Sequence, residues 1–488
     1  MDFKTPEQSG ISSRHVLAFY KELDSSNLST HSVILSRGNS FFSECYYAPF
    51  HKDFQHRMYS TSKSFVSIAV GFCEQDGLLS LDDPVSKYFP ECDPNGHTGT
   101  IREFLQMRTC KESGHGGVGW FTAKPDDRAA FYFTGPARKY PGTLFQYDSA
   151  GSFQLDAIVE RVTGKPFLKY LQEKVLTEIG FSEDAYCLTC PGGHSWGDSG
   201  ILCTARDLWH FARFVLNGGT WGGKQYLNKA YIQRALTMDA PSSDYGFSNL
   251  PGTEGYGYLF WGAPQGCFAT RGMGNQISLC DPAHDFIFVI NSDNQGNQFA
   301  YDQIYHALYS NIIAHLGDPL PEDPEVKAEL DAYLANRKLF FLDKAVSSPM
   351  AEKISGKTFL CQENPTGIQW FRIELDGDTG KFIYENAQGK KTMPFGFGKN
   401  VFAKFPQEGY SDLVGTVPCP GNYYDAAFSA DWPAWDVLRI RVQIIDKYFG
   451  NLAIVLGFRD ENHVTVRMVK AAEDFLDEYK GIFTAVCE

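Results

Sequence analysis

The segment from Ser60 to Phe72 constrains the fold most, because its apolar residues occur on every side of a predicted helix. On one side they recur at the i, i+3, i+4 and i+7 spacing of an α-helix: Phe65, Ile68, Ala69 and Phe72. Val66 and Val70 make the opposite side apolar as well. A helix that is apolar all round is buried, so this segment predicts a central helix rather than a surface helix.

The start of this helix reads Ser60-Thr61-Ser62-Lys63, which places a serine and a lysine one turn apart on the same helix face. At a helix start the Ser60 hydroxyl meets the positive end of the helix dipole. A buried Lys63, its pKa lowered by desolvation, could take the serine proton and so create a nucleophile. The pattern is short, and by itself it favours a plainer interpretation, a serine cap beside a solvated lysine.

Length, charge and cysteine content narrow the class of protein. The chain has 488 residues, 43% of them hydrophobic, so two or three domains are expected. Its formal net charge of −14 argues against nucleic acid and anionic membrane surfaces as partners. No apolar run approaches the roughly 20 residues of a membrane span, and the N-terminus lacks the apolar core of a secretory signal. The twelve cysteines are therefore expected to be reduced thiols of a cytoplasmic protein.

Three short motifs are rejected because their context is wrong. Gly114–Gly119 matches G-x-G-x-x-G, but a helical segment precedes it, so we interpret it as a loop and not as a nucleotide site. Cys187 and Cys190 lack the second ligand pair that a structural zinc site needs. Gly197-Asp198-Ser199-Gly200 imitates trypsin-like proteases without their earlier His and Asp partners. No metal and no organic cofactor is expected.

A second informative stretch surrounds Tyr147. The apolar residues that follow it open a helix that ends near Thr163-Gly164: Ala150, Phe153, Ala157 and Ile158. Tyr147 is thus predicted on a loop just before a helix start, where it can face a cleft. Without Ser60 and Lys63, a tyrosine of the hydrophobic core would be the better interpretation.

The remaining pattern of the first 317 residues predicts an α+β domain. A hairpin is expected from residues 31–36 and 41–47, and the apolar run 286–290 predicts a buried central strand. A helix over residues 301–316 would close this domain, which we place at residues 1–317. The Pro-rich segment 318–324 then begins a linker with a connecting helix, placed at residues 318–349.

From residue 350 the hydrophobic period changes to two. Phe371, Ile373 and Leu375 alternate with polar residues, and so do the apolar residues of 438–444 and 464–468. Turns rich in glycine separate these segments. Residues 350–488 therefore predict an antiparallel β-barrel or sandwich, in which no catalytic constellation is evident.

Three motifs together resemble the serine β-lactamase and penicillin-binding-protein superfamily, specifically its class C-like esterase and amidase branch. They are the S-x-x-K of Ser60 and Lys63, Tyr147-Asp148-Ser149 at the place of Y-x-N, and Thr270-Arg271-Gly272 at the place of K-T-G or H-x-G. The likeness covers residues 1 to about 315 and implies a central antiparallel sheet flanked by helices. The C-terminal region is similar to the lipocalin-like barrels that some members carry.

The resemblance implies a mechanism and a set of site residues. Ser60 would attack an ester or amide carbonyl of a small molecule, with Lys63 and Tyr147 as the shared general base. Backbone N–H groups of Ser60 and Met273 would form the oxyanion hole. Gly272, Arg271, Ser149 and Trp261 would contact the substrate. Trp120, Trp196, Tyr256 and Trp261 could line an apolar acyl pocket, although scattered aromatic residues more often belong to the core.

Two departures from the family motifs bear on the substrate. Ser149 replaces the asparagine that usually helps to hold the substrate amide, and Thr270 replaces the lysine that commonly binds a carboxylate. These changes argue against a true β-lactamase or peptidase of the cell wall. An acyltransferase that passes the acyl group to a hydroxyl or amine stays an alternative, as does a non-catalytic binding protein. The oligomeric state stays open.

Overall fold

The computed structural model describes residues 2–93, 98–111, 123–242, 255–411, 419–473 and 475–487. The chain divides into two compact units, of which the first ends at Lys338 and the second begins at Leu339. This division falls within the segment that the sequence predicts as a linker. The glycine motif at 114–119 and Trp120 lie outside the described residues.

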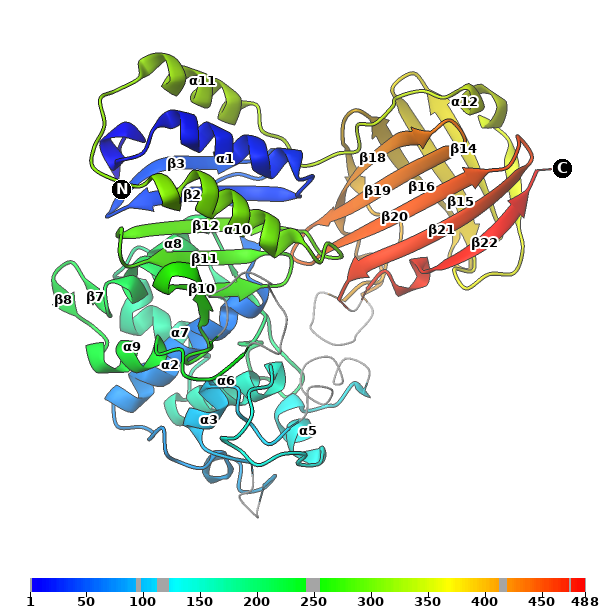
Figure 1. Cartoon of the computed structure of the whole chain (residues 1–488). Helices are drawn as coiled ribbons and strands as arrows, with labels where there is room; N and C mark the ends of the chain where they lie inside the picture. The colour runs from blue at the N-terminus through cyan, green and yellow to red at the C-terminus, as the bar shows by residue number, and fades with distance from the viewer. Residues whose placement is uncertain are drawn as a thin grey trace. The chain divides into compact units, whose positions relative to one another are not determined.

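The first unit is built on a seven-stranded sheet (Figure 1). Its strands follow in the order β1 (Asp2–Phe3), β3 (Ser40–Tyr46), β2 (Thr30–Arg37), β12 (Phe286–Ser292), β11 (Gln276–Asp281), β10 (Cys267–Gly272) and β9 (Trp261–Ala263). All neighbours pair antiparallel except β1 and β3. The predicted hairpin is β2–β3, and the predicted central strand is β12, which is buried along its whole length.

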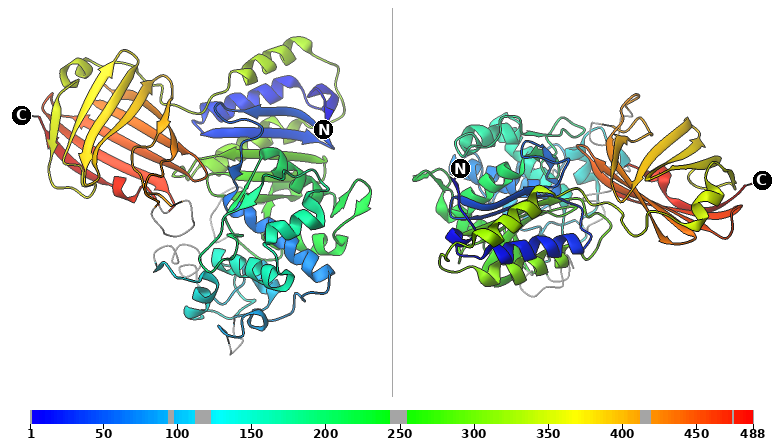
Figure 2. Two further views of the ribbon diagram at one scale, coloured as in Figure 1. Left: turned by 180° about the vertical axis from the view of Figure 1, so that it is seen from behind. Right: turned by 90° about the horizontal axis from the view of Figure 1, so that it is seen from above.

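Three helices cover one face of this sheet, as Figure 2 shows in its view from above. They are α1 (Ser13–Ser25), α10 (Ala300–Asn311) and α11 (Pro324–Ala335). Their apolar residues pack with those of the strands into one continuous core. Since α11 packs on α1, residues beyond 317 also belong to this unit.

The helical part of the unit lies on the other side of the sheet, where α8 (Ala205–Leu216) contacts β11 and β12. Its central helix is α2 (Ser62–Gln75), in which every residue from Ser62 to Cys73 is buried. This helix packs against α6 (Ser149–Thr163). The predicted central helix is therefore confirmed, and so is the α+β fold class.

The second unit is a β-barrel preceded by the short helix α12 (Pro349–Ile354). Its strands are β13 (Thr358–Cys361), β14 (Trp370–Asp376), β15 (Thr379–Asn386), β16 (Gly389–Phe397), β17 (Val401–Lys404), β18 (Asp425–Ala434), β19 (Val437–Ile445), β20 (Phe449–Phe458), β21 (His463–Ala472) and β22 (Gly481–Val486). The pairings are antiparallel except one: β16 pairs parallel with β18 and closes the ring. The barrel is thus mixed at its closure.

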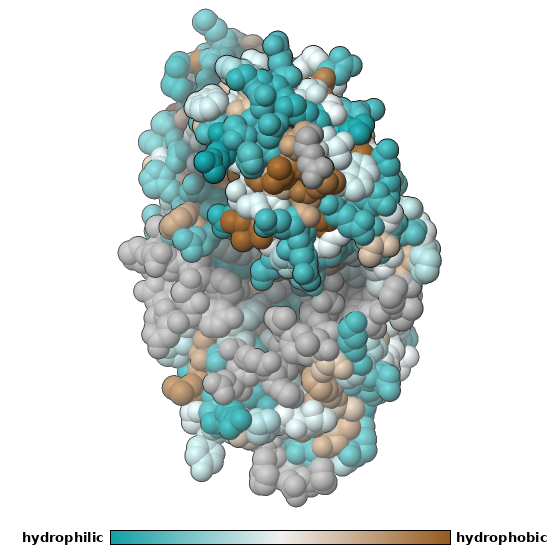
Figure 3. Space-filling view, turned by 90° about the vertical axis from the view of Figure 1, so that its right-hand side faces the viewer, coloured by the Kyte–Doolittle hydropathy of each residue, from teal (hydrophilic) through white to brown (hydrophobic). Residues whose placement is uncertain are grey.

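The predicted alternation decides what fills the barrel. Phe371 and Ile373 are buried in the core, whereas Arg372 and Glu374, which alternate with them, are partly exposed. On the face shown in Figure 3, apolar side chains gather in one region of the surface. Leu360 of β13 and Ile482 and Val486 of β22 are exposed apolar residues on adjacent strands of the barrel. The lipocalin-like assignment of this barrel stays a prediction.

Two further findings concern the chain as a whole. All twelve cysteines are free. Within the described segments, we find no helix with the length and apolar character needed to cross a membrane.

Candidate active site

Ser60 lies on a short 3₁₀ helix, η2 (Tyr59–Thr61), which leads directly into α2. Tyr59 adopts a left-handed backbone conformation with φ of 48°, which costs a non-glycine residue about 1–2 kcal/mol. The surroundings hold it there: the Arg57 guanidinium lies 4.2 Å from the ring centre of Tyr59 and 4.3 Å from that of Trp196. The serine is therefore presented on a sharp, fixed turn rather than inside the helix.

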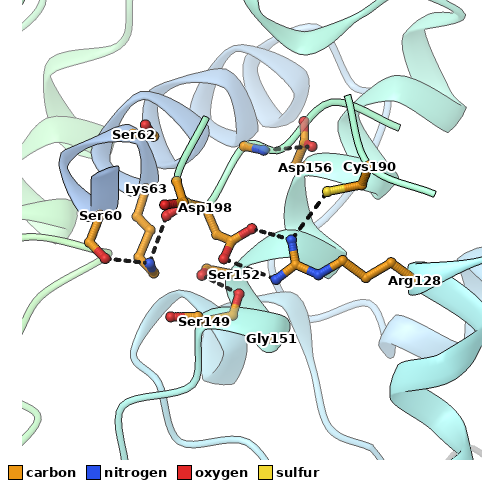
Figure 4. Close-up of polar contacts among 12 residues, drawn as sticks. Ser60, Ser62, Lys63, Arg128, Ser149, Gly151, Ser152, Asp156, Cys190 and Asp198 are labelled. Atoms are coloured by element: carbon orange, nitrogen blue, oxygen red, sulfur yellow. Dashed lines mark hydrogen bonds and ion pairs between the residues drawn. The ribbon is translucent and has the colours of Figure 1, made fainter. Parts of the chain in front are cut away.

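Lys63 lies beside this serine in the first turn of α2 (Figure 4). Its Nζ donates to Ser60 Oγ at 2.9 Å and to the backbone carbonyl of Asp198 at 2.7 Å. Lys63 is only 2% exposed. The predicted pair is thus within hydrogen-bond distance, and its lysine is shielded from bulk water.

Tyr147 reaches the same point from the loop before α6, whose N-cap is Asp148. The Tyr147 ring stacks on that of Trp261, with 5.6 Å between the two ring centres. Lys63 Nζ lies 5.1 Å from the centre of the Tyr147 ring. Burial raises the pKa of Tyr147 above its usual value; a hydrogen bond with Ser60 lowers it and the charge of Asp198 raises it. Near neutral pH the phenol therefore keeps its proton.

The third motif forms the opposite wall, because β10 passes directly behind the serine turn. A Cβ on Gly272 would lie 2.3 Å from the carbonyl oxygen of Met58, so only glycine permits this approach. Met273 follows it and, like Ser60, lines the cavity. Neither backbone N–H of these two residues has an acceptor within the described part of the chain. Two free N–H groups beside a nucleophile are what an oxyanion hole requires.

A cavity of about 550 Å³ opens in front of Ser60. Of the predicted site residues, Tyr147, Trp261, Arg271, Gly272 and Met273 also line it. The rest of the lining comes from Gly274 and Asn275, residues 294–298 and Tyr301. The amide-rich segment 294–298 was missed from the sequence, although its run of Asn, Gln and Gly just after a buried strand was a usable signal.

Other predicted residues are not part of the lining. Ser149 opens α6, where its carbonyl accepts a hydrogen bond from Ser152 at 2.8 Å. Trp196 is buried against Arg57, and Tyr256 packs edge-on against Trp261 at 4.7 Å. These aromatic residues support the site from behind.

Arg271 is a buried cation in the cavity wall, 4% exposed. One nitrogen, Nη2, donates to the carbonyl of Gly262 at 3.1 Å, and the Tyr305 hydroxyl is a further hydrogen-bonding neighbour of the guanidinium. Three rings surround the guanidinium at 5.2–5.6 Å, those of Trp261, Tyr301 and Tyr305. Since no carboxylate pairs with it among the described residues, its charge adds a positive potential to this wall.

The rejected segment Gly197–Gly200 also belongs to the site, though not as a protease motif. It supplies the carbonyl of Asp198 that holds Lys63. No group of three or more His, Cys, Asp or Glu side chains in the described segments could hold a metal ion.

Comparison with known proteins now places the chain. The family model for Beta-lactamase matches residues 24–310, which is more than half of the chain. The chain belongs to the Beta-lactamase family. The matched range lies within the first unit and contains the three motifs described above.

Individual relatives agree with this assignment. A 6-aminohexanoate-dimer hydrolase of Paenarthrobacter ureafaciens is 28% identical over 280 residues, covering 53% of this chain and 71% of that protein. A protein of Bacillus anthracis proposed to be such a hydrolase has a TM-score of 0.53 at 22% identity, covering 66% of this chain and 88% of its own. EstCE1, a hydrolase with promiscuous acyltransferase activity, has a TM-score of 0.50 at 17% identity, covering 61% and 97%. The two structural likenesses show the fold.

Proposed function

We propose that the chain is a serine hydrolase that cleaves an ester or amide bond of a small molecule through an acyl-enzyme on Ser60. The observation that carries this proposal is the 2.9 Å hydrogen bond between Lys63 Nζ and Ser60 Oγ at the wall of a 550 Å³ cavity. Membership of the Beta-lactamase family and a relative named as a hydrolase support it.

In the proposed mechanism Ser60 Oγ attacks the carbonyl carbon while Lys63 takes its proton. Lys63 is the more suitable first acceptor, because burial keeps the phenol of Tyr147 protonated. Tyr147, hydrogen-bonded to Ser60, then passes a proton towards the leaving group and recovers one from Lys63. The N–H groups of Ser60 and Met273 bind the oxyanion, and the charge of Arg271 lies behind them.

The lining of the cavity combines amide side chains and aromatic rings with one cation. The amides come from Asn275 and residues 294–298, the rings from Tyr147, Trp261 and Tyr301, and the cation is Arg271. Thr270 does not replace the missing lysine: its hydroxyl contacts those of Ser278 at 2.9 Å and Thr61 at 3.4 Å inside the fold. We therefore propose an esterase or amidase rather than a β-lactamase. The free cysteines support a cytoplasmic location.

Acyl transfer is the second candidate. The cavity has room for an acceptor next to the acyl group, and EstCE1, similar in fold, is described as having promiscuous acyltransferase activity. A hydroxyl or amine acceptor would then replace water in the second step. A non-catalytic binding protein is disfavoured, because binding alone requires no Lys63 beside Ser60.

Pre-steady-state hydrolysis of p-nitrophenyl acetate tests the proposal. The wild type should release a burst of one p-nitrophenol per chain, and Ser60→Ala should show none. Ser64→Ala is the matched control, since Ser64 is buried in α2, four residues after Ser60, and its hydroxyl donates to the carbonyl of Leu259 instead. A burst that persists in a folded Ser60→Ala protein overturns the proposal. Added alcohols and amines that trap the acyl group would establish transfer.

A further inference from the structure

The carbonyl that holds Lys63 belongs to a tight turn, residues 196–200, that comes from a distant part of the chain. The turn leads into β6 (Ile201–Cys203), which pairs with β4 (His56–Arg57), the strand just before the serine turn. The Arg57 side chain donates to the carbonyl and to the hydroxyl of Ser199, both at 3.2 Å. One side of the turn is therefore fixed to the backbone that carries Ser60.

The two glycines of this turn are closely packed against their neighbours. A Cβ on Gly197 would lie 2.6 Å from Asp156 Cγ, and a Cβ on Gly200 would lie 2.7 Å from the Cβ of Trp196. Such distances are shorter than real Cβ contacts. The direction of the Asp198 carbonyl therefore depends on its close neighbours and on where its own side chain is held.

That side chain forms a buried, two-pronged ion pair with Arg128 of α5 (Arg128–Thr134), at 2.6 and 3.0 Å (Figure 4). The two side chains are 1% and 3% exposed. A buried ion pair is weak evidence for stability, because desolvation offsets most of the attraction. The two parallel hydrogen bonds, however, fix the orientation of the Asp198 side chain, and so they help to orient the backbone carbonyl of the same residue.

Arg128 also connects the turn to the segment that carries Tyr147. Its guanidinium lies 4.2 Å from the ring centre of Phe153 on α6, the helix that begins two residues after Tyr147. It donates to Cys190 Sγ at 3.4 Å as well. One arginine thus touches the element behind Tyr147 and the residue whose carbonyl holds Lys63.

The second effect of the pair is electrostatic, because Arg128 compensates the negative charge of Asp198 near the site. Asp198 is close enough to Tyr147 for its charge to act on that phenol. An Asp198 carboxylate without Arg128 would favour the ammonium form of Lys63, which cannot accept a proton. Other charged or titratable groups also lie near the site. They include Arg57 on β4, Arg271 on β10, Tyr147 and Asp148 before α6, Asp156 and Glu160 on α6, and Cys187 and Cys190 before the turn.

We propose that Arg128 and Asp198 are positioning residues of the Ser60–Lys63 pair. Their ion pair orients the carbonyl that binds Lys63 Nζ, and Arg128 neutralises the carboxylate beside the base. This inference rests on the proposed function, in which Lys63 removes the serine proton.

The test is the pH dependence of Ser60 acylation by a p-nitrophenyl ester in Asp198→Asn and Arg128→Met, whose effects should have opposite signs. Arg128→Met leaves a carboxylate that favours the ammonium, so the rising limb of the pH profile should move up by about one to two pH units. Asp198→Asn leaves a cation that disfavours the ammonium, so the limb should move down. Arg128→Lys keeps the positive charge but loses the two-pronged hydrogen bonding of the guanidinium. The rising limb of its pH profile should therefore stay near that of the wild type, while the acylation rate falls about 10-fold to 100-fold.

Arg213→Met serves as the matched control, because Arg213 is also buried and paired, with Asp285, yet does not line the cavity. Its profile should keep the wild-type position. If Arg128→Met fails to fold, the other two variants test the proposal: the limb should move down in Asp198→Asn and stay in place in Arg128→Lys. Unmoved limbs, or limbs that move in the same direction, overturn the positioning role.

A second readout keeps the two proposals separable. The Lys63 titration can be followed by NMR of ¹³Cε-labelled lysine, with the signal assigned by its loss in Lys63→Arg. It should shift in the same opposite directions in the two variants. A wild type that forms no acyl-enzyme refutes the proposed function, whereas a Lys63 pKa that is equal in all variants refutes the role of Arg128 and Asp198.

Discussion

Replacement of Gly272 by alanine should slow acylation far more than it destabilises the fold. The new Cβ would lie 2.3 Å from Met58 O, and contacts under 3.0 Å are essentially never seen, so β10 and the serine turn must separate by at least 0.7 Å (3.0 minus 2.3). Met58 is two residues before Ser60, and Gly272 directly precedes Met273. The separation therefore widens the space between the two N–H groups of the oxyanion hole.

A misplacement of about 1 Å costs on the order of 100-fold in rate, and overpacking costs about 1–3 kcal/mol of stability. We expect the burst rate with p-nitrophenyl acetate to fall about 10-fold to 100-fold, while thermal unfolding stays cooperative and shifts by a few degrees. Gly317→Ala is the control, because its Cβ would meet nothing within 4 Å. Wild-type acylation by a folded Gly272→Ala protein would refute the placement of the oxyanion hole.

Three further predictions follow from the same geometry. Lys63→Met should lower the burst rate by about 10²- to 10⁴-fold, the usual contribution of a general base, with the fold retained in circular dichroism; a change below 10-fold would contradict its role. Trp261→Ala removes the ring on which Tyr147 stacks, so kcat should fall more than KM rises; an unchanged kcat would show that the stack does not orient Tyr147. Burial lowers the pKa of His56 to about 3, so unfolding takes up a proton below the unfolded value of 6.5. The free energy of unfolding should therefore fall as the pH falls from about 6.5 towards 3, by up to about 1.4 kcal/mol per pH unit. Chemical denaturation at a series of pH values should show a weaker pH dependence for His56→Gln than for the wild type. An equal pH dependence would contradict the low pKa of His56.

The sequence predicted those features that depend on local pattern. The all-round apolar spacing of residues 65–72 identified α2 as a buried helix, and period two identified the barrel strands. Ser60 itself proved to lie in a 3₁₀ turn before α2, because a spacing of three residues fits both kinds of helix. The parallel closure of β16 on β18 could not be predicted, since alternation carries no information on strand direction.

The parts of the site that the sequence did not reveal depend on long-range pairing. Asp198 and Arg128 are 70 positions apart, and no spacing rule joins them. Residue Asp198 even stood in a motif that was rejected for its protease chemistry, whereas its backbone carbonyl is what contacts Lys63. The amide-rich segment 294–298 reaches the cavity because β12 ends beside β11, which in turn pairs with β10.

Labelling with a fluorophosphonate, followed by intact mass and peptide mapping, tests most directly whether Ser60 is the nucleophile. We predict one adduct per chain, on the peptide that contains Ser60, with no adduct on Ser60→Ala and an unchanged one on Ser64→Ala. An adduct that persists in folded Ser60→Ala, or a wild type that reacts with neither the fluorophosphonate nor a p-nitrophenyl ester, would contradict a catalytic Ser60.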